Sequence, residues 1–347
     1  MPLRFAYAPH RLLFRQPFGT SHGMRDGTDA LFIRLEEKGC QGFGEVTLPP
    51  YVQENVVGAL AHFTALAESG PWEAQQLLDA LAAQGLLTET PALRAAVHTA
   101  LLDLLGRMSG RTVRDLLGVP ASGDAIALMT IGICRPEEVA ERLAALPASG
   151  GLKLKVGDEL QLSRLQTIVD SNLRLILLDG NQGLQDVRTA AALARLAGDR
   201  LLGFEQPFPV GREAWCLDLA ALSGALVIGD ESLQDRQDLE RLGRYFGGVN
   251  LKLMKCGGLD RALDMIELAR RSGLRVMLGS MSESALGCTA MAQLAGRAQL
   301  LDLDGPWLLR NDPCKGIRMV DGRLQLPDGP GLGVEVDRSL ALTHIGA

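Results

Sequence analysis

The chain has 347 residues and a formal net charge of −6, with 47% hydrophobic and 22% charged residues. The sequence contains neither a basic run nor an apolar stretch of about 20 residues, so nucleic-acid and membrane partners are not expected. Its six cysteines are scattered without close pairs, and the N-terminus lacks a signal-peptide core, which predicts reduced thiols and a cytoplasmic enzyme.

The first part of the chain, residues 1–122, is predicted to form an α+β domain. Alternating apolar residues predict strands between residues 3 and 45, with a polar, glycine-bearing loop over 19–27 and an irregular stretch over 47–51. Apolar residues at helical spacing then predict helices over 72–84 and 92–108. His98 lies in the second of these helices and is expected to be a structural histidine.

From residue 125 onward, short apolar runs alternate with segments of helical periodicity. This pattern predicts a closed parallel barrel over 123–310, with an open doubly wound sheet as the alternative. The short strand-like pieces of residues 311–347 are expected to return to the first domain. The predicted barrel strands cover 125–133, 151–156, 173–179, 201–205, 225–229, 247–252, 274–278 and 299–303.

Three acidic residues follow successive predicted strands at intervals of roughly 25 residues, about one βα unit each. They are Asp179, Glu205 and Asp230. The carboxyl ends of barrel strands meet at one mouth, so the three carboxylates are expected to converge there. Hard oxygen donors without histidine or cysteine favour Mg²⁺, with Mn²⁺ as the alternative, over unrelated surface acids or helix caps.

Lysines flank these acids. Lys153 and Lys155 share one side of their strand, because side chains alternate with a period of two. Lys252 ends a strand about halfway round the barrel, and Lys255 lies beyond that strand, where a solvent-facing or indirect role is expected. A lysine next to another cation and a metal can serve as a general base, and ion pairing with the acids is the alternative.

Asp302 and Asp304 end the last strand on one face. Two further carboxylates aimed at a site that already holds acids are costly unless positive charge meets them. An ammonium group of the substrate would supply this charge. Such pairs also occur as ordinary turn or helix caps.

The chain resembles the enolase superfamily in its muconate-lactonizing enzyme subgroup, most closely the dipeptide epimerases. The resemblance covers essentially the whole chain, and Asp302-Leu-Asp304 is the discriminating motif. It implies an α/β fold, a modified TIM barrel (β/α)7β with an α+β capping domain formed by the N- and C-terminal segments. The other matching motifs are Lys153-x-Lys155, Asp179-Gly-Asn181-Gln-Gly183, Glu205-Gln-Pro207, Gly229-Asp230-Glu-Ser232 and the segment Asn250 to Gly258.

The resemblance also implies a function, the inversion of the α-carbon of a dipeptide's C-terminal residue. One Mg²⁺ per subunit, held by the three acids, would bind the substrate carboxylate and stabilise an enediolate. Lys155 and Lys252 would exchange the α-proton from opposite faces, and Lys153 would support the pKa of Lys155 and the carboxylate. Asp302 and Asp304 would hold the free α-ammonium group of the dipeptide.

Five further residues are expected to shape the substrate pocket: Arg25, Tyr51, Thr130, Met281 and Glu283. Arg25 would pair with an acidic side chain, as in the L-Ala-D/L-Glu epimerases, or stay in solvent. The resemblance leaves an N-acylamino acid racemase or an o-succinylbenzoate synthase as alternatives, although neither needs the Asp302–Asp304 pair. A non-catalytic barrel that binds a small molecule is the alternative from another class. Relatives commonly form homo-oligomers, but nothing in this sequence bears on oligomeric state.

Overall fold

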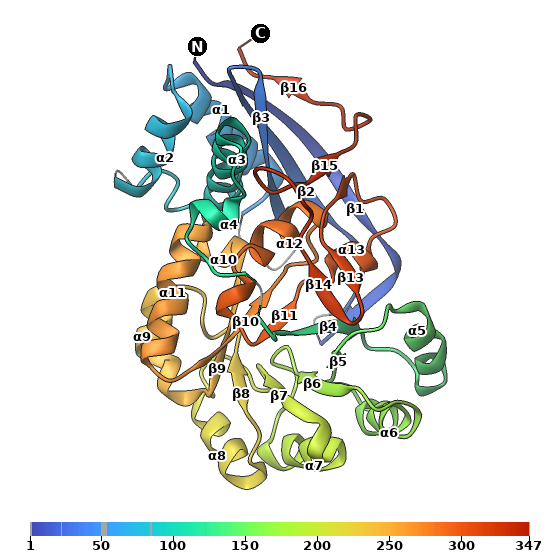
Figure 1. Ribbon diagram of the computed structural model, residues 1–347. Helices are drawn as coiled ribbons and strands as arrows, with labels where there is room; N and C mark the ends of the chain where they lie inside the picture. Colours follow the sequence, from blue (N-terminus) through green and yellow to red (C-terminus); the bar gives the residue numbers. More distant parts are fainter. Residues whose placement is uncertain (1, 22, 50–53, 84, 122, 347) are drawn as a thin grey trace.

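The computed structural model describes residues 2–21, 23–49, 54–83, 85–121 and 123–346. Figure 1 shows an antiparallel sheet with its helices at one end of the molecule and a parallel barrel at the other. Both chain termini lie together at the outer end of the sheet. The prediction of a barrel with an α+β capping domain is therefore confirmed.

The capping sheet has the strand order β16-β1-β2-β3 and is antiparallel in each pair. Its strands are β1 (Arg4–Thr20), β2 (Gly23–Glu37), β3 (Cys40–Leu48) and β16 (Thr343–His344). β16 pairs with β1, so the end of the chain returns to the first sheet. The loop predicted over 19–27 is largely wrong, since β1 and β2 stay paired as far as Thr20 and Gly23. Backbone pairing does not require apolar side chains, and polar residues are acceptable where a hairpin projects beyond the core.

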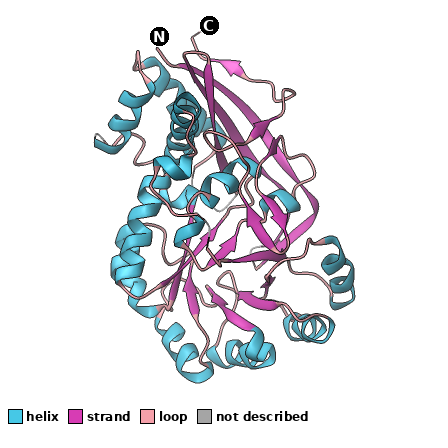
Figure 2. Cartoon of the chain, in the orientation of Figure 1, coloured by secondary structure: helices cyan, strands magenta, loops and turns pink. Residues whose placement is uncertain are grey.

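Three helices accompany this sheet: α1 (Val56–Glu68), α2 (Ala74–Ala83) and α3 (Pro91–Ser109). The sequence patterns did not predict α1, which the side chain of Asn55 caps. α3 is buried along almost its whole length, because its other side faces α10 (Leu253–Cys256). Gly44 permits α3 to approach β3, since a Cβ there would lie 2.0 Å from the Ala96 carbonyl oxygen. The capping domain is thus closely packed on the barrel (Figure 2).

Eight parallel strands close into the barrel, which confirms the closed form and excludes the open sheet. Going round it, the strands are β4 (Ile126–Ile131), β5 (Gly151–Lys155), β6 (Leu175–Asp179), β7 (Leu201–Glu205), β8 (Val227–Gly229), β9 (Gly248–Lys252), β10 (Arg275–Gly279) and β11 (Leu300–Asp302). The helices between them are α5 (Val139–Ala145), α6 (Gln161–Ser171), α7 (Val187–Ala197), α8 (Ala214–Ser223), α9 (Arg236–Leu242), α11 (Leu259–Arg271) and α12 (Ala285–Ala292). Within the described ranges, no helix is long and apolar enough to cross a bilayer.

Short elements complete the chain. They are α4 (Val113–Leu116), α13 (Gly305–Leu308), the pair β12 (Cys314–Lys315) with β15 (Glu335–Val336), and the pair β13 (Arg318–Val320) with β14 (Arg323–Gln325). Single 3-10 turns lie at η1 (Pro136–Glu138), η2 (Gly198–Arg200), η3 (Gly243–Tyr245) and η4 (Ala295–Arg297). All six cysteines are free thiols.

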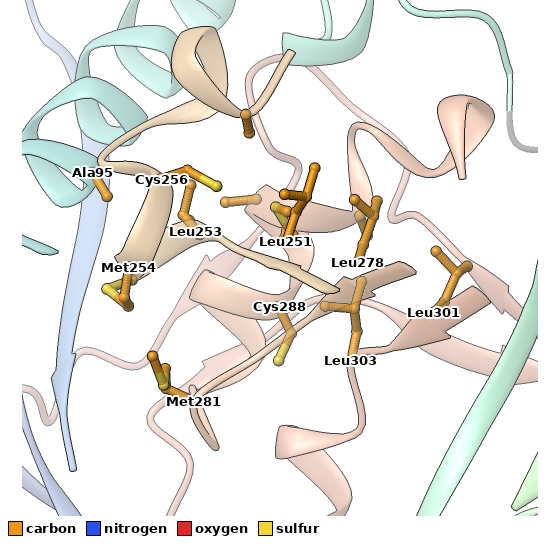
Figure 3. Close-up of a cluster of buried hydrophobic side chains, with 14 of the residues drawn as sticks. Ala95, Leu251, Leu253, Met254, Cys256, Leu278, Met281, Cys288, Leu301 and Leu303 are labelled. Atoms are coloured by element: carbon orange, nitrogen blue, oxygen red, sulfur yellow. The ribbon is translucent and has the colours of Figure 1, made fainter. Parts of the chain in front are cut away.

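Buried apolar side chains hold the strand ends in place. Inside the barrel, Leu128, Leu177, Ile228, Met277 and Leu300 form one cluster. A second and larger cluster continues through the strands into the covering helices and the capping domain. Figure 3 shows part of it, where leucines of β9, β10 and β11 lie near Met254 and Cys256 of α10 and Cys288 of α12. Because cores of this kind are closely packed, the polar groups at the strand ends have fixed positions.

Candidate active site

A cavity of about 970 Å³ lies at the carboxyl ends of the barrel strands. The β1–β2 hairpin of the capping domain also contributes to its wall, through Phe18, Thr20 and Arg25. The cavity therefore lies between the two domains, at the mouth where this fold places its ligands. The predicted site residues that line it are Arg25, Thr130, Lys153, Lys155, Asp230, Lys252, Met281, Asp302 and Asp304.

The three predicted metal ligands lie together at the carboxyl ends of neighbouring strands, where Asp230 also lines the cavity. Asp179 and Glu205 end β6 and β7, Asp230 directly follows β8, and all three are buried. Burial raises the pKa of Glu205 to about 8, and the negative charge of Asp179 adds to the rise. A positively charged partner is therefore needed to keep Glu205 ionised near neutral pH.

Lysine ammonium groups stand among these carboxylates. The Lys153 ammonium nitrogen lies 2.9 Å from Asp179 Oδ2, 2.7 Å from Glu205 Oε2 and 2.6 Å from Asp302 Oδ2. Burial opposes the charge on Lys153, but the attraction of Asp179, Asp302 and Glu205 outweighs it and keeps the pKa of Lys153 well above its usual value. Lys153 is thus held as an ammonium group, paired with the acids.

The donor set suits a divalent cation that prefers oxygen. In the described part of the chain, no three acidic, histidine or cysteine side chains stand in ligating geometry as they are, because Lys153 lies between them. The same contacts show that Asp179 and Glu205 already share one centre of positive charge. Carboxylates alone favour Mg²⁺ over zinc, so the residues fit such an ion if the Lys153 ammonium yields this position.

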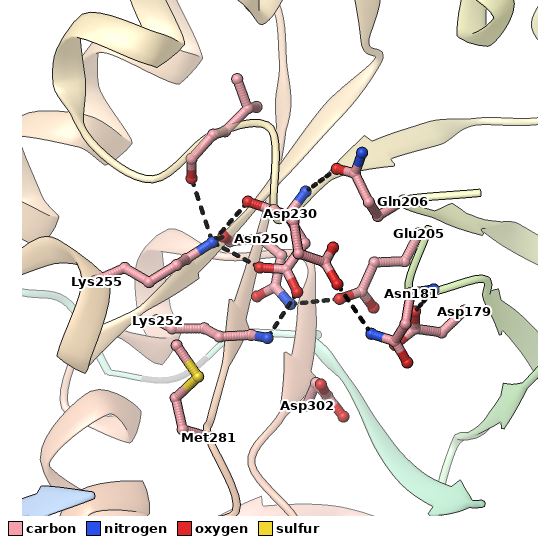
Figure 4. Close-up of polar contacts among 12 residues, drawn as sticks. Asp179, Asn181, Glu205, Gln206, Asp230, Asn250, Lys252, Lys255, Met281 and Asp302 are labelled. Carbon is pink, nitrogen blue, oxygen red and sulfur yellow. Dashed lines mark hydrogen bonds and ion pairs between the residues drawn. The ribbon is translucent and has the colours of Figure 1, made fainter. Parts of the chain in front are cut away.

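Lys155 and Lys252 face each other across the barrel. Each ends its strand, and β5 and β9 are separated by four steps in either direction round the closed barrel. The Lys155 ammonium lies 2.6 Å from Asp179 Oδ2. The Lys252 ammonium lies 2.6 Å from Asp230 Oδ2 (Figure 4). A molecule bound between them would meet one amine on each face.

Lys255 does not face solvent, so that part of its prediction is wrong. Its ammonium donates to Asp230 Oδ1 at 2.6 Å and to the carbonyl oxygens of Asp230, Leu233 and Asn250. The short helix α10 turns the chain inward directly after Lys252, which brings the side chain back over Asp230. Four acceptors for one ammonium group indicate that Lys255 fixes the Asp230 carboxylate.

Asp302 ends β11, Asp304 follows it, and both line the cavity. Asp302 pairs with Lys153, and Asp304 Oδ2 accepts a hydrogen bond from the Thr130 backbone nitrogen at 2.6 Å. Burial, followed by the charge of Asp302, raises the pKa of Asp304 to about 6. A positively charged ligand group here would offset both the cost of burying the Asp304 carboxylate and its repulsion by Asp302.

The predicted specificity residues occupy different places. Arg25 is half-buried, with its guanidinium carbon 5.5 Å from the centre of the Phe14 ring. Met281 lines the cavity, as Lys252 does (Figure 4). Glu283 is fully buried and does not line the cavity, while Tyr51 falls outside the described residues.

Two side-chain amides and one backbone nitrogen, all from asparagine or glutamine residues, support the acids, and the sequence interpretation gave these residues no role. Asn250 Nδ2 donates to Glu205 Oε1 at 2.8 Å, and Gln206 Oε1 accepts from the Asp230 backbone nitrogen at 3.0 Å. The Asn181 backbone nitrogen donates to Asp179 Oδ1 at 2.9 Å. Each of these residues lies within two positions of a predicted acid or lysine of the site. This closeness in the sequence was the signal that could have indicated their supporting role.

Comparison with known proteins identifies the family. The family model "Mandelate racemase / muconate lactonizing enzyme, N-terminal domain" matches residues 6–118, and "Enolase C-terminal domain-like" matches residues 137–340. The chain is 31% identical to the L-Ala-D/L-Glu epimerase of Bacteroides thetaiotaomicron, over 96% of this chain and 88% of that protein. It is 30% identical to the hydrophobic dipeptide epimerase of Flavobacteria bacterium strain MS024-2A, over 95% of this chain and 97% of that protein. The crystal structure of a dipeptide epimerase from Methylococcus capsulatus, complexed with Mg and the dipeptide L-Arg-D-Lys, superposes with a TM-score of 0.84 at 28% identity, over 96% and 99%.

Proposed function

Since the chain belongs to the mandelate racemase/muconate lactonizing enzyme family of the enolase superfamily, we propose that it is a Mg²⁺-dependent dipeptide epimerase. It would invert the α-carbon of the C-terminal residue by proton transfer between two bases. The observation that carries this proposal is the placement of Lys155 and Lys252 on opposite walls of one cavity, with the Asp302–Asp304 pair beside them.

The lysines supply the proton transfers. Lys155 removes the α-proton from one face, and Lys252, as an ammonium group, delivers a proton to the other face. The roles exchange when the substrate has the opposite configuration. Lys153 keeps its positive charge and offsets the carboxylates around it. Mg²⁺ held by Asp179, Glu205 and Asp230 would supply the positive charge that makes an α-proton beside a carboxylate acidic enough for an amine.

Asp302 and Asp304 bind the other end of the dipeptide. They would accept hydrogen bonds from its free α-ammonium group, and charge-assisted hydrogen bonds of this kind orient a substrate strongly. The side chains of the dipeptide are a separate question, because the relatives' names include acidic, hydrophobic and cationic substrates. The test must therefore use all three classes.

The test is deuterium incorporation measured by mass spectrometry. A panel of L,L-dipeptides with acidic, hydrophobic and cationic side chains is incubated with the protein in D2O, with Mg²⁺ or with a chelator. We expect one deuterium at the C-terminal α-carbon and the appearance of the L,D-isomer, both only with Mg²⁺. N-acylamino acids are tested in parallel.

Single lysine variants test the two-base scheme. Lys155→Ala and Lys252→Ala should each abolish epimerisation, because inversion needs one base on each face. A variant that kept full epimerisation would exclude the scheme. Exchange of N-acylamino acids without any exchange of dipeptides would instead show that the assignment of Asp302 and Asp304 to an ammonium group is wrong.

A further inference from the structure

Arg164 of α6 is among the largest fully buried side chains of the described protein. Its Nη2 donates to the backbone carbonyl oxygen of Lys155 at 3.1 Å, and its Nη1 donates to that of Cys134 at 2.8 Å. Lys155 is the last residue of β5, while Cys134 lies in the loop that follows β4. One guanidinium group therefore joins the carboxyl ends of two neighbouring barrel strands.

Asp158 holds this guanidinium group in place. Both Nη atoms of Arg164 also donate to the Asp158 carboxylate, one of them at 3.1 Å. The planar group is therefore bonded to this carboxylate as well as to the two carbonyl groups. Asp158 lies three residues after Lys155, in the turn into α6, and its side chain is 25% exposed. The contacts thus tie the turn after β5 to the strand that precedes it.

The loop whose Cys134 carbonyl group Arg164 binds also connects to the capping domain. Next to Cys134, the backbone nitrogen of Ile133 donates to the Gly19 carbonyl oxygen of the β1–β2 hairpin at 2.9 Å. This hairpin contributes to the cavity wall. Burying an arginine costs free energy that burying an apolar residue would not. An arginine at this place is therefore better explained by the position that it gives to the two carbonyl groups than by a contribution to the stability of the fold.

We propose that Arg164 is a positioning residue that fixes the end of β5 and thereby places the Lys155 ammonium for proton transfer. This inference rests on the proposed two-base function. A displacement of about 1 Å at a reacting group costs on the order of 100-fold in rate. Loss of the Arg164 contacts should therefore impair Lys155, while Lys252 on the opposite wall keeps its own supports.

Arg94 of α3 offers a matched comparison. It is as deeply buried and binds Asp260 through two hydrogen bonds of 3.0 and 2.7 Å. Its remaining acceptors are the carbonyl oxygens of Gly257, which ends α10 on the β9 side of the barrel, and of Leu81 in α2. None of these four contacts lies at β5. A variant at Arg94 disturbs a buried arginine network of similar size without touching the support of Lys155.

The readout is α-proton exchange measured separately from the two epimers in D2O. If Lys155 is misplaced, the epimer that it deprotonates stops exchanging. The opposite epimer is still deprotonated and reprotonated by Lys252, so it exchanges with retention of configuration. The variants Lys155→Ala and Lys252→Ala define which epimer belongs to which lysine. General damage to the fold would lower both exchange rates together.

Arg164→Met removes the donors and keeps much of the side-chain length. We expect exchange of the Lys155-dependent epimer to fall about 10-fold or more relative to the other epimer, in the same direction as in Lys155→Ala. Arg164→Lys, which keeps one donor group and the charge, should show a smaller asymmetry. If Arg164→Met does not fold, as judged by its melting curve, Asp158→Asn replaces it, because that partly exposed partner orients the guanidinium group.

Two results would overturn the inference while the proposed function stands. One is an equal fall for both epimers in the Arg164 variants. The other is a Lys155-like asymmetry in Arg94→Lys. Failure of the wild-type protein to exchange either epimer of any dipeptide would be a different result, which would refute the proposed function and this inference with it.

Discussion

Replacement of Glu283 by glutamine tests the electrostatics behind the cavity wall. Glu283 is fully buried, its Oε1 accepts a hydrogen bond from the Met281 backbone nitrogen at 3.1 Å, and its Oε2 has no hydrogen-bond partner among the described residues. Burial raises its pKa to about 8, and the nearby charge of Glu45 adds to the rise. Glutamine has the shape of the protonated acid and can still accept the bond from Met281.

The sign and size of the effect follow from proton linkage. Between its ordinary pKa of 4.5 and its folded pKa of about 8, Glu283 is ionised in the unfolded chain but protonated in the folded one. The free energy of unfolding therefore falls as pH rises through this range. Each pKa unit corresponds to about 1.4 kcal/mol, so the fall is at most about 5 kcal/mol. Glu283→Gln removes this loss, so the variant should equal the wild type near pH 5 and exceed it near pH 8.

The assay is thermal melting of both proteins at pH 5 and pH 8. For a chain of this length the gain at pH 8 corresponds to about 5 °C in Tm, and all other titrating groups cancel because both proteins share them. The exposed Glu267→Gln serves as the control, with the same Tm difference at both pH values. A Tm difference for Glu283→Gln that did not change with pH would refute the reasoning.

Three further predictions concern other parts of the molecule. Burial lowers the pKa of His98 to about 4, so below pH 6.5 the unfolded chain binds a proton that the folded chain excludes. The free energy of unfolding should therefore fall by about 3 kcal/mol from pH 6.5 to pH 4. Denaturant titrations should show a smaller fall in the variant His98→Gln. In the same assay, Gly44→Ala should lower the free energy of unfolding by about 3 kcal/mol, because the new Cβ would meet the Ala96 carbonyl oxygen. The control Gly123→Ala, which has open space around its Cβ, should change the free energy of unfolding by no more than about 0.5 kcal/mol. Asp304→Asn should lower kcat/KM for the dipeptide on the order of 10- to 100-fold with unchanged Mg²⁺ affinity in calorimetry, and an unaltered kcat/KM would exclude its contact with the ammonium group.

Local patterns in the sequence were sufficient for the order of the barrel's strands and helices, although they left the closure of the barrel open. The predicted strand 201–205 coincides with β7, because periodicity of side chains is a property of neighbouring residues. Acids and lysines that end apolar runs could be assigned to one mouth, since all parallel strands of a barrel point the same way. The capping helix α1 was missed, because its Val56–Glu68 segment is apolar on most sides and lacks a clear polar face.

Tertiary structure alone decided which charges meet. That Lys153 contacts three carboxylates and that Lys255 folds back onto Asp230 depends on distances between strands far apart in the chain. The bonds from Arg164 to the carbonyl groups of Lys155 and Cys134 are equally invisible in the sequence, because any backbone carbonyl can accept them. Sequence thus determined the elements and the chemistry available at their ends, while the closure of the barrel and the packing of the capping domain determined which of those groups lie within hydrogen-bond distance.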